Sequence, residues 1–565
     1  MQRLPSKWRF GLCGLCLTTM PIALVWHLAQ LQILPGQEKG FQFLQEQGQA
    51  RTLRTEKINA YRGAIMDRNG ELLAVSTPVI SIFANPQRVK SEEIPALAKA
   101  LKLTESELRA RFKTYADKQF VYLERHLPPQ EATPILARNF AGVDGQEEYQ
   151  RYYPSGEVSA HVVGFTDIDD SGQEGMELAL NEWLAGAPGA KQVIKDLRGN
   201  VVKDLGLLRA SESGKDVRLS IDLRLQYLAY RELKAAIAEQ QAAAGSVVIL
   251  DVESGEILAM ANQPSYNPND RAQLHPQQLR NRAITDVLEP GSTMKPFAVV
   301  AALETGRYKP HTKINTHPGY IQVGRKTLLD HRDYGILDVT GVITKSSQVG
   351  ITKIALDMEP ERIRDLFFRV GLGQSTGLGF PGEAVGVLPN PPRWSDIERA
   401  ALAFGHGVSV TAVQLAQAYA TLASGGKLRP VSLLKKAKDP EGKSVISAEI
   451  AYQVKQMLRT VTQPGGTAVR AQVPAYGVAG KTGTAHKVGE NGYAANRYVA
   501  LFAGMAPAQN PRLVAVVIID EPSEDRYYGG EAAAPVFAKI MEGALRLMHV
   551  PPAEDVKLTQ RGNQG

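Results

Sequence analysis

The sequence predicts an α+β protein, and its second half carries the plainest signals. Residues 245–261 contain two buried, strand-like runs around a turn at Glu253-Ser254-Gly255, which is the pattern of an antiparallel hairpin. Residues 498–505 and 512–519 give a second pair of strands of the same kind. A helical pattern with regularly spaced apolar residues precedes the first hairpin, at 223–241. We therefore expect an antiparallel sheet covered by helices.

The overall composition is that of an ordinary globular protein. The chain has 565 residues, enough for two or three domains, of which 44% are hydrophobic and 22% charged. Its formal net charge of +7 is spread along the chain without a long basic run, so nucleic acid is not predicted as a partner. A solvated basic surface explains this charge, and so does an exported protein beside an anionic envelope polymer. The last residues, 551–565, are polar and predicted to be disordered.

A membrane anchor is predicted at the start of the chain. An uncharged, apolar stretch begins at Phe10 and has roughly the length that a helix needs to span a bilayer. The basic residues before it favour a cytoplasmic tail at 1–9, an inner-membrane anchor at 10–30 and a periplasmic remainder. The alternative is a cleaved signal peptide, which a shortened, soluble product would reveal. Cys13 and Cys16 are the only cysteines and lie in this stretch, so no disulfide, metal site or lipid anchor is predicted.

Residues 31–215 are predicted to form an elongated, mixed α+β module without catalytic residues. Its polar start, residues 38–60, is typical of a stalk. The segment from Arg62 to Ala74 contains two short strand-like runs joined at Asn69-Gly70, which is a strong hairpin signal. No acidic pair stands out of the kind that a glycosyltransferase needs. We therefore expect a pedestal that serves docking or dimerisation.

Ser292 and Lys295 are the centre of the predicted catalytic unit, residues 216–550. A serine and a lysine three residues apart can share one face of a helix. A turn at Glu289-Pro290-Gly291 precedes them and an apolar helical run follows. Ser292 would then lie at a helix N-terminus, where free backbone N–H groups favour negative charge. Lys295 could take the hydroxyl proton if burial or a neighbouring cation lowers its pKa.

Two further motifs complete the series Ser-x-x-Lys, Ser-x-amide and Lys-Thr-Gly. Lys345-Ser346-Ser347-Gln348 lies in a helical context, and Ser346 follows Ser292 by 54 residues (346 − 292). Gly480-Lys481-Thr482-Gly483-Thr484 follows a strand-like run, with Lys481 placed 135 residues after Ser346 (481 − 346). One such motif is common by chance, but three in this order are highly specific.

With these motifs the chain resembles the penicillin-binding, serine-active D,D-transpeptidases, and among them the class B, single-spanning members. The resemblance extends over nearly the whole chain. It includes the anchor, the segments Arg62 to Ala74 and Leu219 to Asp222, and the motif Tyr527 to Phe537. Within the class, the division-specific, septal type is the most similar. The resemblance implies a transpeptidase domain like that of serine β-lactamases, with helices on both faces of an antiparallel sheet.

The resemblance also implies a role for each motif residue. Ser292 is the nucleophile for the penultimate D-Ala carbonyl of a stem peptide, and Lys295 is the general base, which must be neutral to act. Ser346 relays a proton between Lys295, Lys481 and the leaving amine. The remaining roles are carboxylate recognition by Lys481, Thr482 and Thr484, close passage of the substrate backbone past Gly483, and an oxyanion hole made of the N–H groups of Ser292 and Thr484. No metal or cofactor is implied.

Gln348 departs from the family pattern, which has Asn at this position. Gln keeps the amide but adds one methylene, so its head group reaches further. Asn at this site normally orients the lysine and the substrate amide, and the change therefore puts the placement of Lys295 in question. It points either to an altered rate or β-lactam profile or to a paralogue with a shifted role.

Two groups outside the motifs are expected beside the same cleft. His406 is interpreted as a structural residue that lines the cleft, because the serine and lysine residues already supply the proton transfer. Tyr527 and Tyr528 are expected in a loop near the cleft, where packing is the simpler role and substrate contact the alternative.

The function that this resemblance predicts is cross-linking of peptidoglycan stem peptides from a lipid-linked precursor at the septum, with β-lactams as inhibitors. A polytopic division glycosyltransferase and other division proteins are the implied partners. An elongation-type or paralogous transpeptidase, a β-lactamase or carboxypeptidase, and an inactive β-lactam-binding sensor or scaffold are the alternatives. The anchor and the N-terminal module weigh against a hydrolase. The intact motif residues weigh against an inactive protein, and Gln348 alone favours one.

Overall fold

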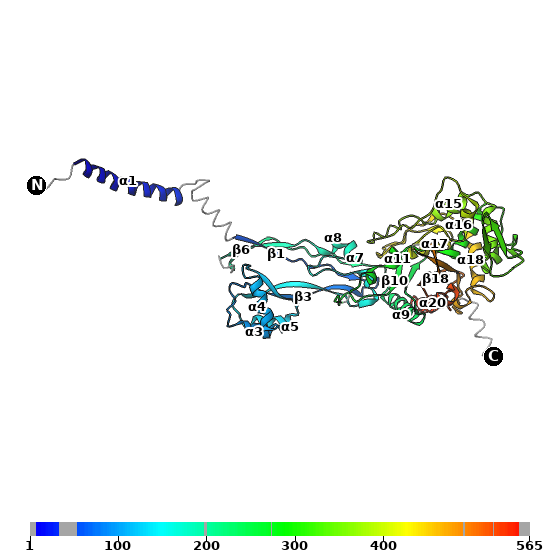
Figure 1. Cartoon of the computed structure of the whole chain (residues 1–565), viewed down its shortest axis with the longest axis horizontal. Helices are drawn as coiled ribbons and strands as arrows, with labels where there is room; N and C mark the ends of the chain where they lie inside the picture. Colours follow the sequence, from blue (N-terminus) through cyan, green and yellow to red (C-terminus); the bar gives the residue numbers. More distant parts are fainter. Residues whose placement is uncertain are drawn as a thin grey trace. The chain divides into compact units, whose positions relative to one another are not determined.

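The computed structural model describes residues 7–32, 53–196, 201–272, 274–489, 492–523 and 525–552. Most of the predicted stalk and polar tail and part of the predicted cytoplasmic tail lie outside these residues. Figure 1 shows the course of the chain and labels its elements.

The chain divides into two compact units that interleave in sequence. Unit 1 comprises Met1–Tyr61, Pro78–Tyr149 and Ala185–Gly214, and unit 2 comprises Arg62–Thr77, Gln150–Leu184 and Lys215–Gly565. The expected boundary between residues 215 and 216 therefore does not coincide with the edge of unit 2. Two segments of the predicted N-terminal module, Arg62–Thr77 and Gln150–Leu184, belong to unit 2 because their contacts lie within it.

The N-terminal helix α1 spans Lys7–Gln32, which includes the predicted anchor at 10–30. Among the described residues it is the one helix long and apolar enough to cross a membrane, with a mean hydropathy of 1.7 in its most apolar window. Cys13 and Cys16 are exposed on it and form no disulfide.

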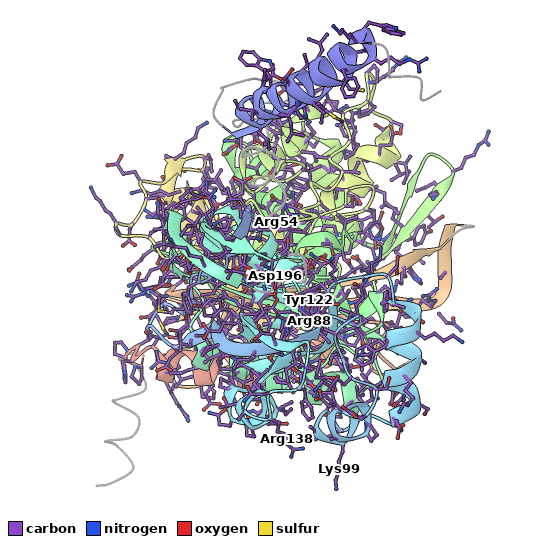
Figure 2. The ribbon with its side chains drawn as sticks, turned by 90° about the vertical axis from the view of Figure 1, so that its left-hand side faces the viewer. Arg54, Arg88, Lys99, Tyr122, Arg138 and Asp196 are labelled. Carbon is purple, nitrogen blue, oxygen red and sulfur yellow. The ribbon has the colours of Figure 1, made fainter. Side chains whose placement is uncertain are left out.

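Unit 1 contains a three-stranded antiparallel sheet in the order β1-β6-β7 and a second group in which β3 pairs with β4 and β5. Three helices cover the second group around one apolar core, which includes Ile82, Leu97, Leu108, Leu123 and Ala132. Figure 2 shows the side chains of Lys99 and Arg138 pointing away from the ribbon. The elements are β1 (Leu53–Ile58), β3 (Leu72–Ala84), α3 (Ile94–Ala100), α4 (Glu105–Thr114), β4 (Val121–Leu127), α5 (Pro129–Leu136), β5 (Val143–Tyr152), β6 (Gly189–Lys195) and β7 (Val201–Arg209).

Unit 2 is built on a five-stranded sheet in the order β10-β9-β19-β18-β17, and every neighbouring pair is antiparallel. The strands are β9 (Ala244–Asp251), β10 (Ile257–Gln263), β17 (Ala479–Gly489), β18 (Gly492–Ala506) and β19 (Leu513–Asp520). Both predicted strand pairs are confirmed. Every residue of β9 and β10 is buried, so the sheet is covered on both faces.

Two groups of helices provide this cover. Helices α9 (Leu223–Glu239) and α20 (Ala534–Leu547) contact each other and lie on one face. Helices α11 (Arg282–Thr285), α17 (Ala412–Ala423) and α18 (Ala448–Thr462) lie on the other face, which Figure 1 shows above the strands. The expected antiparallel sheet with helices on both faces is therefore confirmed.

Shorter elements surround this core. The hairpin expected at Asn69-Gly70 is confirmed, because Ile65 of β2 pairs with Ala74 of β3, and Gly70 has a φ of +97° in the turn. The remaining elements of unit 2 are β2 (Ile65–Met66), η1 (Gly156–Val158), α6 (Ala160–Val163), α7 (Gly175–Ala179), α8 (Asn181–Ala185), β8 (Val217–Arg218), α10 (Pro276–Leu279), η2 (Gly291–Met294), α12 (Lys295–Glu304), β11 (Lys313–Asn315), β12 (Tyr320–Val323), β13 (Lys326–Leu329), β14 (Ile336–Asp338), α13 (Val339–Thr344), α14 (Gln348–Leu356), α15 (Glu361–Arg369), α16 (Asp396–Ala403), β15 (Lys427–Leu428), β16 (Lys443–Ser444), η3 (Val469–Ala471) and α19 (Gly529–Ala532).

A buried ionic cluster joins the two N-terminal segments of unit 2. Arg62 Nε donates to Glu177 Oε2 at 2.7 Å, and Arg151 Nε donates to Glu177 Oε1 at 2.6 Å. Arg62 also donates to Asn181 Oδ1 at 2.9 Å. Arg62 and Glu177 are fully buried. Because each buried charge has a partner of opposite sign, the cluster fixes these segments to one another.

Candidate active site

Ser292 lies in the 3₁₀ turn η2, directly before helix α12, as the sequence predicts. The turn is held from outside. Gly291, at a φ of +54°, donates its N–H to the carbonyl of Gly405 at 3.1 Å. The buried Tyr419 hydroxyl of α17 donates to the carbonyl of Thr293 at 2.8 Å. Two distant segments therefore fix the backbone on either side of Ser292.

Lys295 is the first residue of α12, and its side chain points into the protein. Its Nζ donates to the carbonyl of Ser346 at 2.5 Å and lies 3.2 Å from Ser346 Oγ. Within the described part of the chain, no hydrogen bond joins Lys295 Nζ to the Ser292 hydroxyl. Both side chains line the same cleft, and catalytic hydrogen bonds are often long before substrate binds.

Ser346 lies in the short turn between α13 and α14. Its φ is +56°, a left-handed conformation that a residue with a side chain adopts only when its surroundings impose it. This conformation puts Ser346 Oγ 2.9 Å from Lys481 Nζ, on β17. The Ser346 hydroxyl thus lies between the amines of two lysines.

Asp330 holds this turn, and the sequence analysis missed it. Its Oδ2 accepts from the Ser347 hydroxyl at 2.6 Å, and its Oδ1 accepts from the backbone N–H groups of Gln348 at 2.5 Å and Val349 at 3.1 Å. Asp330 therefore caps the N-terminus of α14 from a loop after β13. No local pattern distinguishes it in the sequence.

Burial changes the acid–base properties of both lysines. Lys295 is 2% exposed and Lys481 is fully buried. Burial lowers the pKa of Lys295 to about 7, against the opposing effect of the Asp330 carboxylate. Burial and the neighbouring Lys295 hold the pKa of Lys481 well below its ordinary range. A buried amine that is neutral near physiological pH can accept a proton.

The motif from Lys481 to Thr484 lies on β17, an edge strand of the sheet, as expected. Thr482 Oγ1 lies 3.1 Å from Thr467 Oγ1, and Thr484 Oγ1 accepts from the N–H of Gly529 at 3.0 Å. Both threonines line the cleft. This placement suits the expected contact with a substrate carboxylate, which stays a prediction, as does the oxyanion hole.

Gly483 packs closely against the nucleophile turn, and the expected passage of the substrate backbone past it stays a prediction. A Cβ at this position would lie 2.8 Å from the carbonyl oxygen of Pro290 and 3.0 Å from Thr293 Cγ2. The missing side chain therefore faces the turn that carries Ser292. Its absence lets β17 approach that turn closely, which brings Thr484 beside Gly291.

The cleft has a volume of about 900 Å³ and contains most of the predicted site residues. Ser292, Lys295, Ser346, Gln348, Thr482 and Thr484 line it. Lys481, which donates to Ser346 Oγ, and Gly483 are not among its lining residues. His406 also lines the cleft, with Nε2 3.9 Å from Glu289 Oε2, and burial lowers its pKa. Its structural interpretation stays a prediction.

An aromatic wall borders the cleft, formed by Tyr498, Tyr527, Tyr528 and His486. The rings of Tyr498 and Tyr527 are stacked with centroids 4.2 Å apart, and Tyr528 follows at 4.3 Å from Tyr527. The His486 ring lies 4.6 Å from Tyr498. The expected position of Tyr527 and Tyr528 near the cleft is confirmed, whereas Tyr498 and His486 were not expected there.

Comparison with known proteins agrees with this geometry. Residues 245–542 match the family described as "Penicillin binding protein transpeptidase domain", and residues 57–219 match "Penicillin-binding Protein dimerisation domain". The chain belongs to the penicillin-binding protein transpeptidase family. The first match spans the sheet of unit 2 and all three motifs.

Curated relatives in this family match nearly the full chain. It is 43% identical over 554 residues to "Peptidoglycan D,D-transpeptidase FtsI" of Escherichia coli K12, covering 97% of this chain and 93% of that protein. It is 42% identical over 548 residues to "Probable peptidoglycan D,D-transpeptidase PbpC" of Pseudomonas aeruginosa, covering 97% and 96%. The two identities are nearly equal, so they do not select one type of transpeptidase.

Solved structures of the family show the same fold. The transpeptidase domain of penicillin-binding protein 3 from Burkholderia pseudomallei is 42% identical, with a TM-score of 0.55, and the match covers 59% of this chain and 97% of that one. Penicillin-binding protein 3 from Mycobacterium tuberculosis is 30% identical, with a TM-score of 0.68, and the match covers 88% and 98%.

Gln348 begins α14, and its side chain lines the cleft. Only its backbone N–H is engaged by Asp330. Among the described residues, no hydrogen bond joins its amide to Lys295 or Ser346. The contacts between the two lysines and Ser346 therefore do not involve this amide, and its effect on rate stays a prediction.

Proposed function

We propose that this penicillin-binding protein is a peptidoglycan D,D-transpeptidase that acts through an acyl-enzyme on Ser292. The observation that carries the proposal is the Ser346 hydroxyl, 2.9 Å from Lys481 Nζ and 3.2 Å from Lys295 Nζ, at a cleft that also contains Ser292. The names of the relatives support the same reaction class.

Acylation begins with neutral Lys295. It removes the proton from the Ser292 hydroxyl as Oγ attacks the penultimate D-Ala carbonyl. The Oγ–C bond forms, the C–N bond to the terminal D-Ala breaks, and the proton reaches the leaving amine through Ser346. The N–H groups of Ser292 and Thr484 stabilise the oxyanion, an effect worth about 3 kcal/mol for each donor.

The second half-reaction reverses these roles. An amine from a neighbouring stem peptide attacks the ester, its C–N bond forms, and the Ser292 Oγ–C bond breaks. The proton of the amine returns to Ser292 through the same lysine and serine groups. Before it leaves in the first half-reaction, the terminal D-Ala of the donor peptide is held at its carboxylate by Thr482 and Thr484, and Lys481 supports Thr482 by donating to its Oγ1. A β-lactam acylates Ser292 in the same way but leaves an ester that turns over slowly.

Helix α1 supports a single-pass position in the inner membrane, with the N-terminus in the cytoplasm and unit 2 in the periplasm. The likeness to a relative named FtsI supports septal cross-linking. A polytopic division glycosyltransferase and other division proteins are then the partners, and a lipid-linked precursor supplies the stem peptides. The proposed domains after the anchor are the non-catalytic module at 31–215 and the transpeptidase domain at 216–550.

A paralogous transpeptidase role is the second candidate. Two observations favour it: Gln348 replaces the family's Asn, and the likeness to a protein named PbpC is as strong as that to FtsI. A fluorescent fusion separates the roles, because a septal enzyme concentrates at midcell whereas an elongation-type enzyme follows the side wall.

Labelling with a fluorescent penicillin tests the chemistry. The full-length protein should form a stable covalent adduct at Ser292, located by peptide mass spectrometry, and Ser292→Ala should form none. Rapid hydrolysis of the penicillin would indicate a β-lactamase or carboxypeptidase instead. A stable adduct without cross-linking of lipid-linked precursor would indicate a sensor or scaffold.

A further inference from the structure

Asp330 lies beside the motif residues but belongs to none of the three motifs. Its carboxylate accepts three hydrogen bonds, from the Ser347 hydroxyl and from the backbone N–H groups of Gln348 and Val349. These partners follow Ser346 directly in the chain. Ser347 is itself buried, and its Oγ accepts from the N–H of Gly350 at 2.8 Å. Asp330 therefore fixes the chain immediately after Ser346.

The backbone of Ser346 needs such a restraint. A serine at a φ of +56° is in a sparsely populated region, and the neighbouring structure must compensate for its conformational cost. The bonds from Lys295 and Lys481 to Ser346 Oγ depend on this conformation. Without Asp330, the turn can relax and carry the hydroxyl away from the two amines.

The carboxylate also supplies negative charge to a site rich in positive groups. Asp330 lines the cleft, and its charge raises the pKa of Lys295 against the effect of burial. The titratable groups around this centre are Lys295, Lys481, His406, Glu289, His486 and Tyr334. Glu289 acts on His406, so Asp330 is the carboxylate that acts on Lys295.

We propose that Asp330 is a positioning residue for acylation, which holds the Ser346 turn against Lys295 and Lys481 through its hydrogen bonds and places a negative charge beside Lys295. The inference rests on the proposed acyl-enzyme function. It assigns two separable effects to one carboxylate, one through hydrogen bonds and one through charge.

The test is the pH dependence of acylation by a fluorescent penicillin, measured as a second-order rate constant on the full-length protein. Asp330→Asn removes the charge while its Oδ1 still accepts from the two backbone N–H groups. Its rate should fall between about 10- and 100-fold at high pH, because the turn loses its bond from Ser347. The acid limb should move to lower pH by about one unit, because removing a nearby negative charge lowers the pKa of Lys295.

Asp330→Glu and Asp333→Asn are the companion variants. Asp330→Glu keeps the charge but displaces it, so its rate should fall while its acid limb stays near that of the unchanged protein. Asp333 lies in the same loop, pairs with His317 and does not line the cleft, so Asp333→Asn should alter neither quantity. Thermal melting of each variant confirms that it is folded.

The outcomes distinguish a failure of the Asp330 inference from a failure of the proposed acyl-enzyme function. A slower Asp330→Asn variant with an unmoved acid limb would make Asp330 merely structural and overturn the inference, as would an unchanged rate. Both results leave the proposed function intact. Failure of the unchanged protein to form any adduct at Ser292 would instead overturn the proposed function, and this inference with it.

Discussion

Unit 2 contains two buried clusters of basic side chains that differ in whether a carboxylate binds them. In the first, Arg62 and Arg151 both bind the Glu177 carboxylate, at 2.7 and 2.6 Å. In the second, Lys295 and Lys481 both hydrogen-bond the neutral Ser346, at Oγ distances of 3.2 and 2.9 Å, and Lys481 also donates to the neutral Thr482. The nearest carboxylate, Asp330, acts on Lys295 without a hydrogen bond among the described residues.

Because of this difference, the Arg62 cluster holds the backbone in place, whereas the lysine cluster can transfer protons. A guanidinium always keeps its proton, so it can bind a carboxylate but cannot act as a base. A buried lysine without an ion-pair partner loses its proton readily. The pKa of Lys295, about 7, therefore makes it a base, while the Arg62 cluster fixes the backbone.

The largest effect is expected when the base is replaced by a side chain that always stays charged, like the arginines of the Arg62 cluster. Lys295→Arg retains a positive side chain but cannot lose its proton, so the acylation rate constant should fall between about 10² and 10⁴-fold. Stopped-flow or gel-based labelling with a fluorescent penicillin measures it. Lys353→Arg, on α14 and outside the cleft, is the matched control and should acylate normally. Normal acylation of Lys295→Arg would remove Lys295 as the base.

A change in the structural cluster should affect stability instead. Glu177→Gln removes the carboxylate that binds both buried guanidinium groups, and should lower the free energy of unfolding by about 3–5 kcal/mol. Chemical denaturation of the purified protein measures this loss. The folded variant should acylate within about twofold of the normal rate at low temperature.

The control for this change is Glu182→Gln on α8, because Glu182 is exposed. Its stability should change by less than about 0.5 kcal/mol. If Glu177→Gln were as stable as this control, the two clusters would not differ in the way described here.

The smallest effect is expected at Gln348. Gln348→Asn shortens the side chain by one methylene but keeps the hydrogen bond from the backbone N–H to Asp330, so acylation should be unchanged or faster. Gln348→Ala should be slower, since it removes a polar amide from the lining of the cleft. A large loss in Gln348→Asn would mean that this chain specifically requires the longer side chain, and would favour the paralogous role.

The sequence predicted the parts of the site that follow local rules. The nucleophile turn, the edge strand with Lys481 and both strand pairs of the sheet come from turn residues and apolar periodicity over short windows. It did not predict Asp330 or the Arg62 cluster. Asp330 is one of 58 acidic residues, and Arg62 meets a partner 115 positions away. Only the folded backbone selects such partners, and for the same reason the interleaving of the two units was missed.

The pH dependence of acylation in the unchanged protein tests the central claim most directly. The second-order rate constant for a fluorescent penicillin should rise with pH through a midpoint near 7 and then level off, because Lys295 is protonated below its pKa of about 7 and neutral above it. A rate constant that stays flat from about pH 5 to 9, or that rises only near the ordinary lysine pKa of about 10.4, would contradict the assignment of Lys295 as a neutral, buried base.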